Sequence, residues 1–156
     1  MMDGRVQFEQ VLAEFGEKLG TKLELVDDRC NFIVDGTVEV EIDYYPDAEC
    51  LVAWSTVGEL PEDDLSAARA LALLAMNELG SFRAGFTLSM DAETRRVVAH
   101  DRRGVEAVDS ADRLAVWTDT LVDLVKGVRS DFAKRFPFDG GDADSEADAG
   151  SEGKEA

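Results

Sequence analysis

The segment from 64 to 80, DLSAARALALLAMNELG, constrains the fold most, because it has the composition of a helix but no polar side. Alanine and leucine are strong helix formers. At about 100° per residue, Leu71 and Leu73 point to opposite sides of the helix and Leu74 points in a third direction. A helix that is apolar all round is buried all round. One side can pack on a sheet, and another element must cover the rest.

Two arrangements would cover this helix. The first and last helices of the chain could sandwich it within one molecule. Alternatively, the same helix of a second copy could pack on it across a two-fold axis, since its many alanines permit close approach. We favour the dimer, because a domain of this size has few other elements to spare.

The N-terminal region predicts an amphipathic helix over 8–20, FEQVLAEFGEKLG. Its apolar residues recur at the spacing of one helical face. Gly20 is a suitable C-terminal stop. Gly16 lies inside the helix, where it either costs stability or lets another chain come close. The predicted buried stripe is Phe8, Val11, Leu12, Phe15 and Leu19.

The first strands of a sheet are expected soon after this helix. Apolar and polar residues alternate over 23–26, LELV, and an apolar run covers 30–34, CNFIV. Asp35-Gly36 then provides a typical two-residue hairpin turn. These segments predict two short strands and the start of an antiparallel meander.

Two longer strands are expected next. Residues 37–45 alternate cleanly and predict a half-buried strand, and the turn Pro46-Asp47-Ala48 follows it. Residues 50–57, CLVAWSTV, are apolar on both faces, so we expect both faces to be covered. The inward residues of the first of these strands are Val38, Val40, Ile42 and Tyr44, opposite Glu39, Glu41 and Asp43.

The second half of the chain predicts a helix capped by Asp63 or Asp64, a hairpin and a final helix. The hairpin joins strands at 82–90 and 95–101, and the second of these is the weaker. The basic doublets on that strand predict a solvated edge. The final helix begins between 109 and 112, and its buried stripe is Leu114, Trp117, Leu121, Val125, Val128, Phe132 and Phe136.

The order of these elements is helix, strands, helix, two strands, helix. Strands do not alternate singly with helices, which disfavours a parallel doubly wound sheet. The sequence therefore predicts an α+β domain, in which three helices pack on a twisted antiparallel sheet. We expect this domain to span 1–137.

Residues 138–156 differ in composition from the rest of the chain. From 139 onward they hold seven acidic residues, one lysine and no large apolar residue. Such a segment cannot bury enough apolar surface to offset its ordering entropy. We expect a disordered acidic tail, and its acidic spacing lacks the order of a calcium loop.

The composition excludes several function classes. A formal net charge of −18 repels phosphate backbones, so nucleic-acid binding is not expected. No apolar run reaches the roughly 18 residues of a membrane span, and the N-terminus lacks a secretory signal pattern. We expect a soluble cytoplasmic protein.

Cys30 and Cys50 lie in apolar runs and predict small buried side chains rather than a disulfide or metal site.

Motifs of an active site are missing as well. There is no P-loop, no G-x-G-x-x-G and no G-x-S-x-G segment. His100, the only histidine, stands beside Asp101 without a nucleophile in a recognisable turn. We therefore expect no catalytic residues, no cofactor and no metal.

The hairpin region carries a resemblance to a known family. Gly85-Phe86-Thr87-Leu88 begins a strand, Asp91-Ala92-Glu93-Thr94 forms an acidic turn, and Arg96-Val97-Val98-Ala99 begins the return strand. With the small size, the acidity and the order of elements, this region resembles the class I type III secretion chaperones, the Tir chaperone family. The resemblance covers 5–136, whereas the charged segment at 102–110 and the acidic tail depart from the family pattern.

The resemblance implies a homodimer in the bacterial cytoplasm that binds the N-terminal segment of a secreted effector in extended form, without ATP. The central helix would supply the dimer face, and the first helix and first strands would form the client groove. Transferred to this chain, the dimer face is Ala67, Ala70, Leu71 and Leu74, and the groove residues are Leu25, Phe32, Val34 and Trp54.

Two other functions remain open on the sequence. The same fold serves a regulatory or sensory protein of the YbjN-like family, without an export client. An enzyme with an unrecognised carboxylate site would need a concave pocket that holds perturbed acidic groups. The acidic tail either contacts an export ATPase or only keeps the protein soluble.

Overall fold

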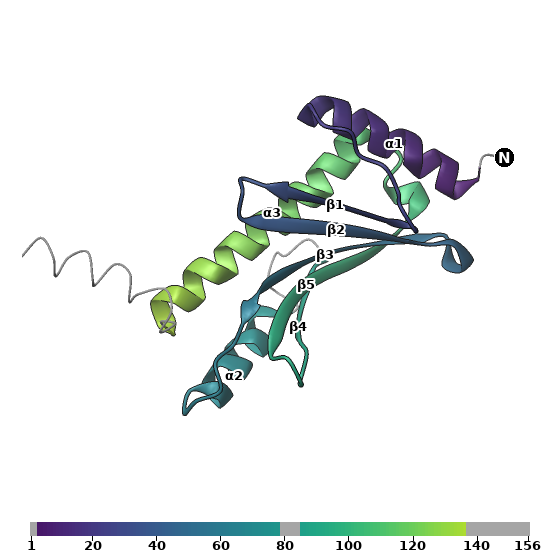
Figure 1. Ribbon diagram of the computed structural model, residues 1–156. Helices are drawn as coiled ribbons and strands as arrows, with labels where there is room; N and C mark the ends of the chain where they lie inside the picture. The colour runs from purple at the N-terminus through teal and green to yellow at the C-terminus, as the bar shows by residue number, and fades with distance from the viewer. Residues whose placement is uncertain (1–2, 79–84, 137–156) are drawn as a thin grey trace, which may run out of the picture.

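A single antiparallel sheet organises the fold, with strand order β1-β2-β3-β5-β4 (Figure 1). The computed structural model describes residues 3–78 and 85–136. The α+β class and the antiparallel sheet predicted from the sequence are confirmed. The elements are α1 (Gly4–Leu19), β1 (Arg29–Val34), β2 (Val38–Tyr45), β3 (Cys50–Glu59), α2 (Ser66–Met76), β4 (Thr87–Met90), β5 (Arg96–Gly104) and α3 (Ala111–Arg135), with short 3-10 turns at Pro46–Ala48 and Val105–Ala107.

Helix α1 begins and ends where its sequence signals lie. The carboxylate of Asp3 accepts a hydrogen bond from the amide of Arg5, and Gly20 adopts the left-handed conformation with φ of 73°. The predicted stripe from Phe8 to Phe15 is buried. Leu19 is an exception, since 51% of its surface is exposed because the helix ends beyond the edge of the core.

The segment after α1 corrects one expectation. Residues 23–26 form no strand, and only a single bridge pairs Val26 with Arg29. Leu23 and Leu25 are nevertheless buried. Residues 23–26 therefore form an extended loop and not a strand, and the loop packs Leu23 and Leu25 against the core. The hairpin at Asp35-Gly36 is confirmed, since both residues have positive φ and strands β1 and β2 pair on either side.

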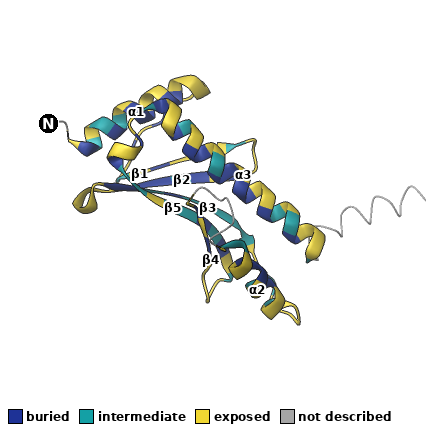
Figure 2. Ribbon diagram, turned by 180° about the vertical axis from the view of Figure 1, so that it is seen from behind, coloured by how far each residue is buried: buried dark blue, intermediate teal, exposed yellow. Residues whose placement is uncertain are grey.

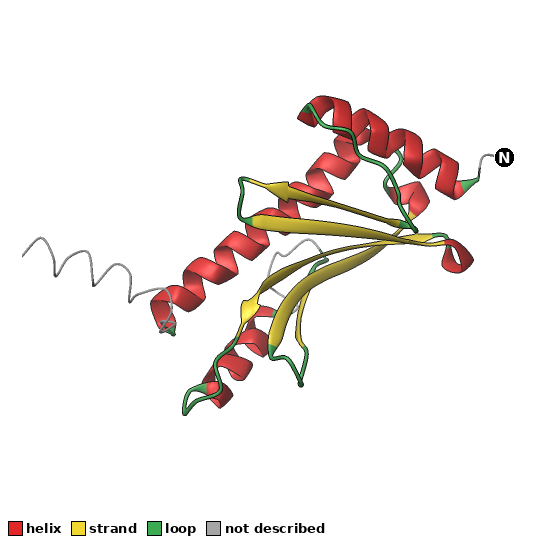
Figure 3. Cartoon of the chain, in the orientation of Figure 1, coloured by secondary structure: helices red, strands yellow, loops and turns green. Residues whose placement is uncertain are grey.

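The helices α1 and α3 cover one face of the sheet and leave the other face open (Figure 3). Helix α3 packs against β2, β3 and β5, and α1 packs against α3. Val38, Val40 and Ile42 point into this core and are fully buried. Only the side chains on one face of each strand therefore reach the hydrophobic core, as alternation along a strand requires.

Strands β3 and β5 occupy the centre of the sheet. On β3, Leu51 and Ala53 are fully buried, whereas Val52 and Trp54 on the other face are half-buried. The expectation that both faces are covered is therefore met on one face only. Strand β5 lies between β3 and β4. It is an interior strand and not the solvated edge expected from its arginines.

Helix α3 has the predicted stripe, and its members are buried except for the half-buried Phe136. Ser110 caps its first turn by accepting a hydrogen bond from the amide of Arg113. Both cysteines are buried and free, as expected, and burial raises the pKa of Cys30 to about 11. Phe82, Ala84 and the acidic tail expected at 138–156 lie outside the described residues.

Helix α2 packs on the molecule by one side only (Figure 2). Arg69, Ala72 and Leu73 are its buried residues, whereas Leu71 and Leu74 are 68% and 69% exposed. Within the described part of the chain, α1 and α3 therefore leave this side of α2 uncovered. Its first turn also differs from the prediction, because Leu65 occupies the N-cap position that Asp63 or Asp64 was expected to fill.

Candidate interaction surfaces

Strand β1 is an edge of the sheet, and among the described residues its outer side pairs only with Val26, through Arg29. The carbonyl of Asp28 accepts a hydrogen bond from the amide of Tyr44 in β2. Backbone groups alternate along a strand, so the amides of Asn31 and Ile33 point to the free side. The Ile33 side chain is 66% exposed. An exposed edge of this kind is a template for pairing with a further extended chain.

Three of the predicted groove residues lie on the helix-covered side of β1. Phe32 and Val34 are partly buried against the core. The ring of Phe32 stacks edge-on against that of Phe15 in α1, with 5.7 Å between ring centroids. Leu25 is 9% exposed and belongs to the core itself. These residues join β1 to α1, and Leu25 offers little surface to a partner.

Trp54, the fourth predicted groove residue, lies on the open face. It pairs in register with Glu41 of β2 and His100 of β5. Its indole Nε1 donates a hydrogen bond of 3.0 Å to Oδ2 of Asp43. The structure therefore places Leu25, Phe32 and Val34 at the core on the helix-covered side of the sheet, and Trp54 on the opposite face.

The open face is arranged in rows that follow the strands. Carboxylates stand on β2, mostly apolar side chains stand on β3, and basic side chains with one valine stand on β5. Asp43 lies opposite Val52, which lies opposite Arg102. A hollow of about 160 Å³ at one end of the β3 row is lined by Tyr45, Ala48, Cys50, Val52 and Arg102.

The carboxylates of β2 differ in their surroundings. Asp43 is only 9% exposed. Its Oδ1 has no hydrogen-bond partner, and Nε of Arg29 lies 3.7 Å away. Burial and the neighbouring Asp43 carboxylate raise the pKa of Glu41 above its usual range. This corner of the open face therefore holds more negative charge than its own donors neutralise.

A second hollow lies along α1. It has a volume of about 630 Å³ and runs between the C-terminal half of the helix and the loop at 20–25. Its walls combine apolar and acidic side chains, which are Glu9, Ala13, Glu17, Leu23, Glu24 and Leu25, together with Gly20, Thr21 and Lys22. Leu23 and Glu24 also line a smaller hollow that reaches Arg29 and Asn31 of β1.

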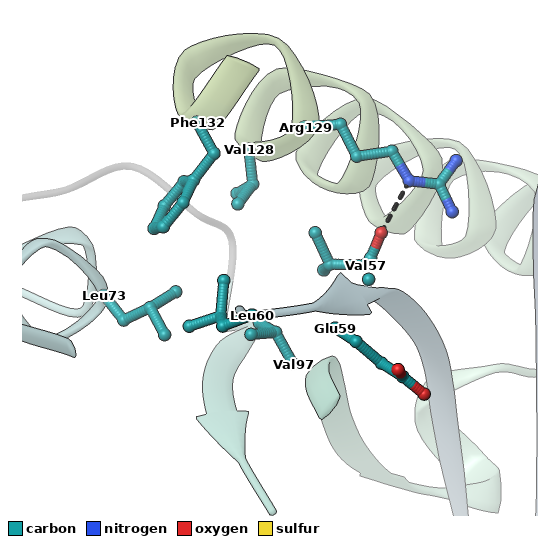
Figure 4. A pocket seen from close by; sticks show the side chains of 9 residues that line it. Val57, Glu59, Leu60, Leu73, Val97, Val128, Arg129 and Phe132 are labelled. Carbon is teal, nitrogen blue, oxygen red and sulfur yellow. Dashed lines mark hydrogen bonds between the residues drawn. The ribbon is translucent and has the colours of Figure 1, made fainter. Parts of the chain in front are cut away.

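An apolar cavity of about 360 Å³ separates α2 from the C-terminal half of α3. Figure 4 shows Val128 and Phe132 pointing into it from α3, and Leu73 of α2 pointing toward Leu60. Arg129 closes one end, since its Nε donates a hydrogen bond of 2.8 Å to the carbonyl of Val57. Its Nη2 donates a hydrogen bond of 3.1 Å to the carbonyl of Thr56. These bonds satisfy carbonyl groups where the β3–β5 register shifts.

The predicted dimer residues lie on α2, on its uncovered part. Leu71 and Leu74 are exposed, as is Ala67, and Ala70 is half-buried. Two leucines presented together on a helix form an apolar surface that favours a protein contact. No second copy is present, so the dimer face stays a prediction.

No group of three or more potential metal ligands occurs among 3–78 and 85–136. His100 Nε2 lies 3.1 Å from Ser89 Oγ on the surface of the sheet. No helix within the described ranges is long and apolar enough to cross a membrane.

Sequence reasoning missed the roles of Ile33 and Asp43. The alternation of β2 marked Asp43 as outward and polar, but it did not indicate that Asp43 is buried and bonded to Trp54. Ile33 stood in an apolar run, where no pattern marks which residues face the core. The hairpin turn at Asp35-Gly36 could have placed Ile33, because it sets the register between the two strands. In that register Ile33 pairs with the outward Glu39, and residues paired across a hairpin share a face.

The comparisons with known proteins point to one family. The sequence model of the Tir chaperone protein (CesT) family matches residues 10–129. No curated protein matched the sequence.

Solved structures resemble the fold over most of the chain. One is from the HopA1-SchA chaperone-effector complex, with a TM-score of 0.66, 23% identity, and coverage of 83% of this chain and 98% of that one. Another, from the ExsC-ExsE complex, has a TM-score of 0.68 and 18% identity, and covers 83% and 96%. YbjN from E. coli, described as a putative transcription regulator, has a TM-score of 0.54 and 12% identity, and covers 81% and 92%. These likenesses establish the shared fold.

Proposed function

The chain belongs to the Tir chaperone protein (CesT) family, and we propose that it is a chaperone for a secreted effector. It binds the N-terminal segment of that effector in extended form and keeps it competent for export by a type III secretion system. The free edge of β1 carries this proposal. Asn31 and Ile33 offer backbone groups to an added strand there, beside the apolar side chains that join β1 to α1.

Strand addition explains how one surface can hold an unfolded client. Main-chain hydrogen bonds supply affinity for any extended segment, and pockets for alternate side chains supply selectivity. The hollow along α1 shares Leu23 and Glu24 with a smaller hollow that is also lined by Asn31 of β1, so together the two hollows can receive such side chains. The net charge of −18 keeps a protein with exposed apolar surfaces from associating with itself without control.

We further propose that the working form is a homodimer in the bacterial cytoplasm. The exposed side of α2, with Leu71 and Leu74, is the surface we assign to the second copy. Burying two leucines against a symmetric partner removes apolar area from water on both chains. The acidic tail at 138–156 is proposed to solubilise the complex or to contact an export ATPase.

The experiment is an affinity pull-down of the tagged protein from its native cells, with mass spectrometry of the captured proteins. We expect one secreted protein to be enriched through its N-terminal region. Ile33→Asp places a charge beside the free edge and should reduce capture about tenfold or more. Val116→Asp is the matched control, because Val116 is equally exposed at 66% on α3.

The alternative is a regulatory protein of the YbjN-like kind. It predicts that no exported protein is captured while secretion genes are expressed, and that the two variants behave alike. Equal capture by Ile33→Asp and Val116→Asp would also move the client away from β1.

A further inference from the structure

The open face of the sheet presents a paired chemical pattern that the β1 edge does not use. Carboxylates on β2 stand next to the apolar row on β3, in register across the two strands. Glu41 lies opposite Trp54, and Asp43 lies opposite Val52. The helices α1 and α3 lie on the other side of the sheet (Figure 3). A partner on this face would meet negative charge along one strand and apolar surface along the next.

The carboxylate of Asp43 lacks hydrogen-bond donors on this face. A carboxylate that is 9% exposed normally receives several hydrogen bonds. Here Oδ2 accepts one from the Trp54 indole, and Oδ1 accepts none. The nearest cation, Arg29, is 3.7 Å away and its side chain is 69% exposed. Arg29 is thus a loosely held ion-pair partner that a better-placed donor can replace.

A cation from outside would find two kinds of support at this point. The Glu41 and Asp43 carboxylates provide charge-assisted acceptors. The half-buried face of the Trp54 indole provides a ring on which a guanidinium can stack. Both kinds suit arginine better than a neutral donor. At the end of the same row, the hollow beside Val52 and Tyr45 can take an apolar side chain.

We propose that the open sheet face binds a client segment in which an arginine is flanked by apolar residues. The guanidinium lies over Trp54 and donates to Asp43 and Glu41, and a neighbouring apolar side chain enters the hollow beside Val52. This proposal rests on the proposed function, since the segment belongs to the client. A second copy is the less suitable occupant, because the exposed leucines of α2 already offer a self-complementary apolar surface.

The test uses a synthetic pentapeptide, acetyl-Leu-Ala-Arg-Ala-Leu-amide, and the same peptide with citrulline in place of arginine. Citrulline keeps the shape of the side chain and removes its charge. The two indole N–H resonances of the ¹⁵N-labelled full-length protein are followed during titration. Trp117 is 1% exposed and serves as the internal control. We expect the arginine peptide to shift the Trp54 indole resonance alone, and the citrulline peptide to bind about fivefold more weakly or worse.

Three variants sharpen the result. Asp43→Asn keeps an oxygen acceptor for Trp54 but removes the charge, so it should weaken binding of the arginine peptide about fivefold. Arg29→Gln removes the competing cation and should strengthen binding. Asp64→Asn, at an exposed position outside this face, should leave the affinity unchanged.

Two outcomes of the peptide titration overturn the proposal. One is equal binding of the two peptides, or no shift of the Trp54 resonance at millimolar peptide. The other is a Trp54 shift that depends on protein concentration alone, because it would assign the face to a second copy. The peptide titration does not depend on client capture. A protein that captures its effector equally well with Asp43→Asn would therefore retain the proposed function and lose this inference.

Discussion

The guanidinium of Arg69 donates two hydrogen bonds to the carboxylate of Asp63. One runs from Nη1 to Oδ1 and the other from Nη2 to Oδ2, the second at 3.1 Å. Arg69 is 1% exposed, although it stands on an otherwise apolar helix. Its Nη1 also donates to the carbonyl of Pro61, and Nη2 of Arg95, in the turn before β5, donates to the same carbonyl at 3.1 Å. The two arginines thereby fix the loop between β3 and α2, and with it the direction in which α2 leaves the sheet.

Asp63→Asn should destabilise the protein by leaving a buried guanidinium without its counter-charge. The hydrogen bond from Arg69 holds the pKa of Asp63 below its usual range. The pair therefore stabilises the folded state at neutral pH and loses this effect as pH falls below about 4. Urea unfolding at pH 7 and pH 3 measures the difference from wild type. Equal midpoints for Asp63→Asn and the neighbouring Asp64→Asn at pH 7 would contradict this role.

Gly16 and Gly127, both within helices, should respond oppositely to alanine. A Cβ on Gly16 would stand 2.6 Å from the carbonyl oxygen of Thr21, whereas one on Gly127 would meet nothing within 4 Å. Gly16→Ala should cost about 1–3 kcal/mol of unfolding free energy through overpacking. Gly127→Ala should add about 0.5–1 kcal/mol through helix propensity. Thermal and urea unfolding provide the comparison, and a stabilised Gly16→Ala protein would be inconsistent with the close approach.

Leu71→Asp and Leu74→Asp test the proposed dimer. Each places a charge on the exposed side of α2, where a symmetric partner would bury it twice. We expect the dissociation constant to rise about a hundredfold, as measured by analytical ultracentrifugation. Val116→Asp, at an equally exposed position on α3, should remain dimeric. A monomeric wild type at high micromolar concentration would instead remove the dimer itself.

Glu41→Gln should raise the stability of the protein at pH 7. The pKa of Glu41 is raised in the folded state by burial and by the nearby Asp43. The folded state therefore binds the proton more tightly than the unfolded state, and ionisation of Glu41 costs stability above its folded pKa. The advantage of Glu41→Gln should vanish below about pH 4, where wild type is protonated as well. Glu39→Gln, exposed on the same strand, controls for the change in net charge.

The local elements of this fold could be predicted from the sequence because their signals are local. The stripe of α3 and the alternation of β2 place residues on the core face without knowledge of any partner. Gly20 and Asp35-Gly36 mark chain reversals, since they adopt positive φ at low cost. The family resemblance in the hairpin from 85 to 99 agrees with the family match.

The neighbours of each element could not be predicted in the same way. Strand β5 looked weak because of its arginines, yet it lies inside the sheet, since strand order depends on pairings between residues far apart in sequence. Leu25 and Trp54 both looked like surface apolar residues. The loop after α1 carries Leu25 into the core, and the register of β3 turns Trp54 to the open face.

The sequence by itself determined most of the helices and strands, with 23–26 as the exception, the apolar stripe of each, and the apolar character of α2 on more than one side. These properties follow from side-chain spacing and backbone preference within a short window. Only the tertiary structure decided that Leu71 and Leu74 remain exposed, that β1 is an edge strand, and that Asp43 is buried with one oxygen bonded to the Trp54 indole and the other unpaired. Each of those depends on which distant segments pack together, because burial is a property of the assembled chain.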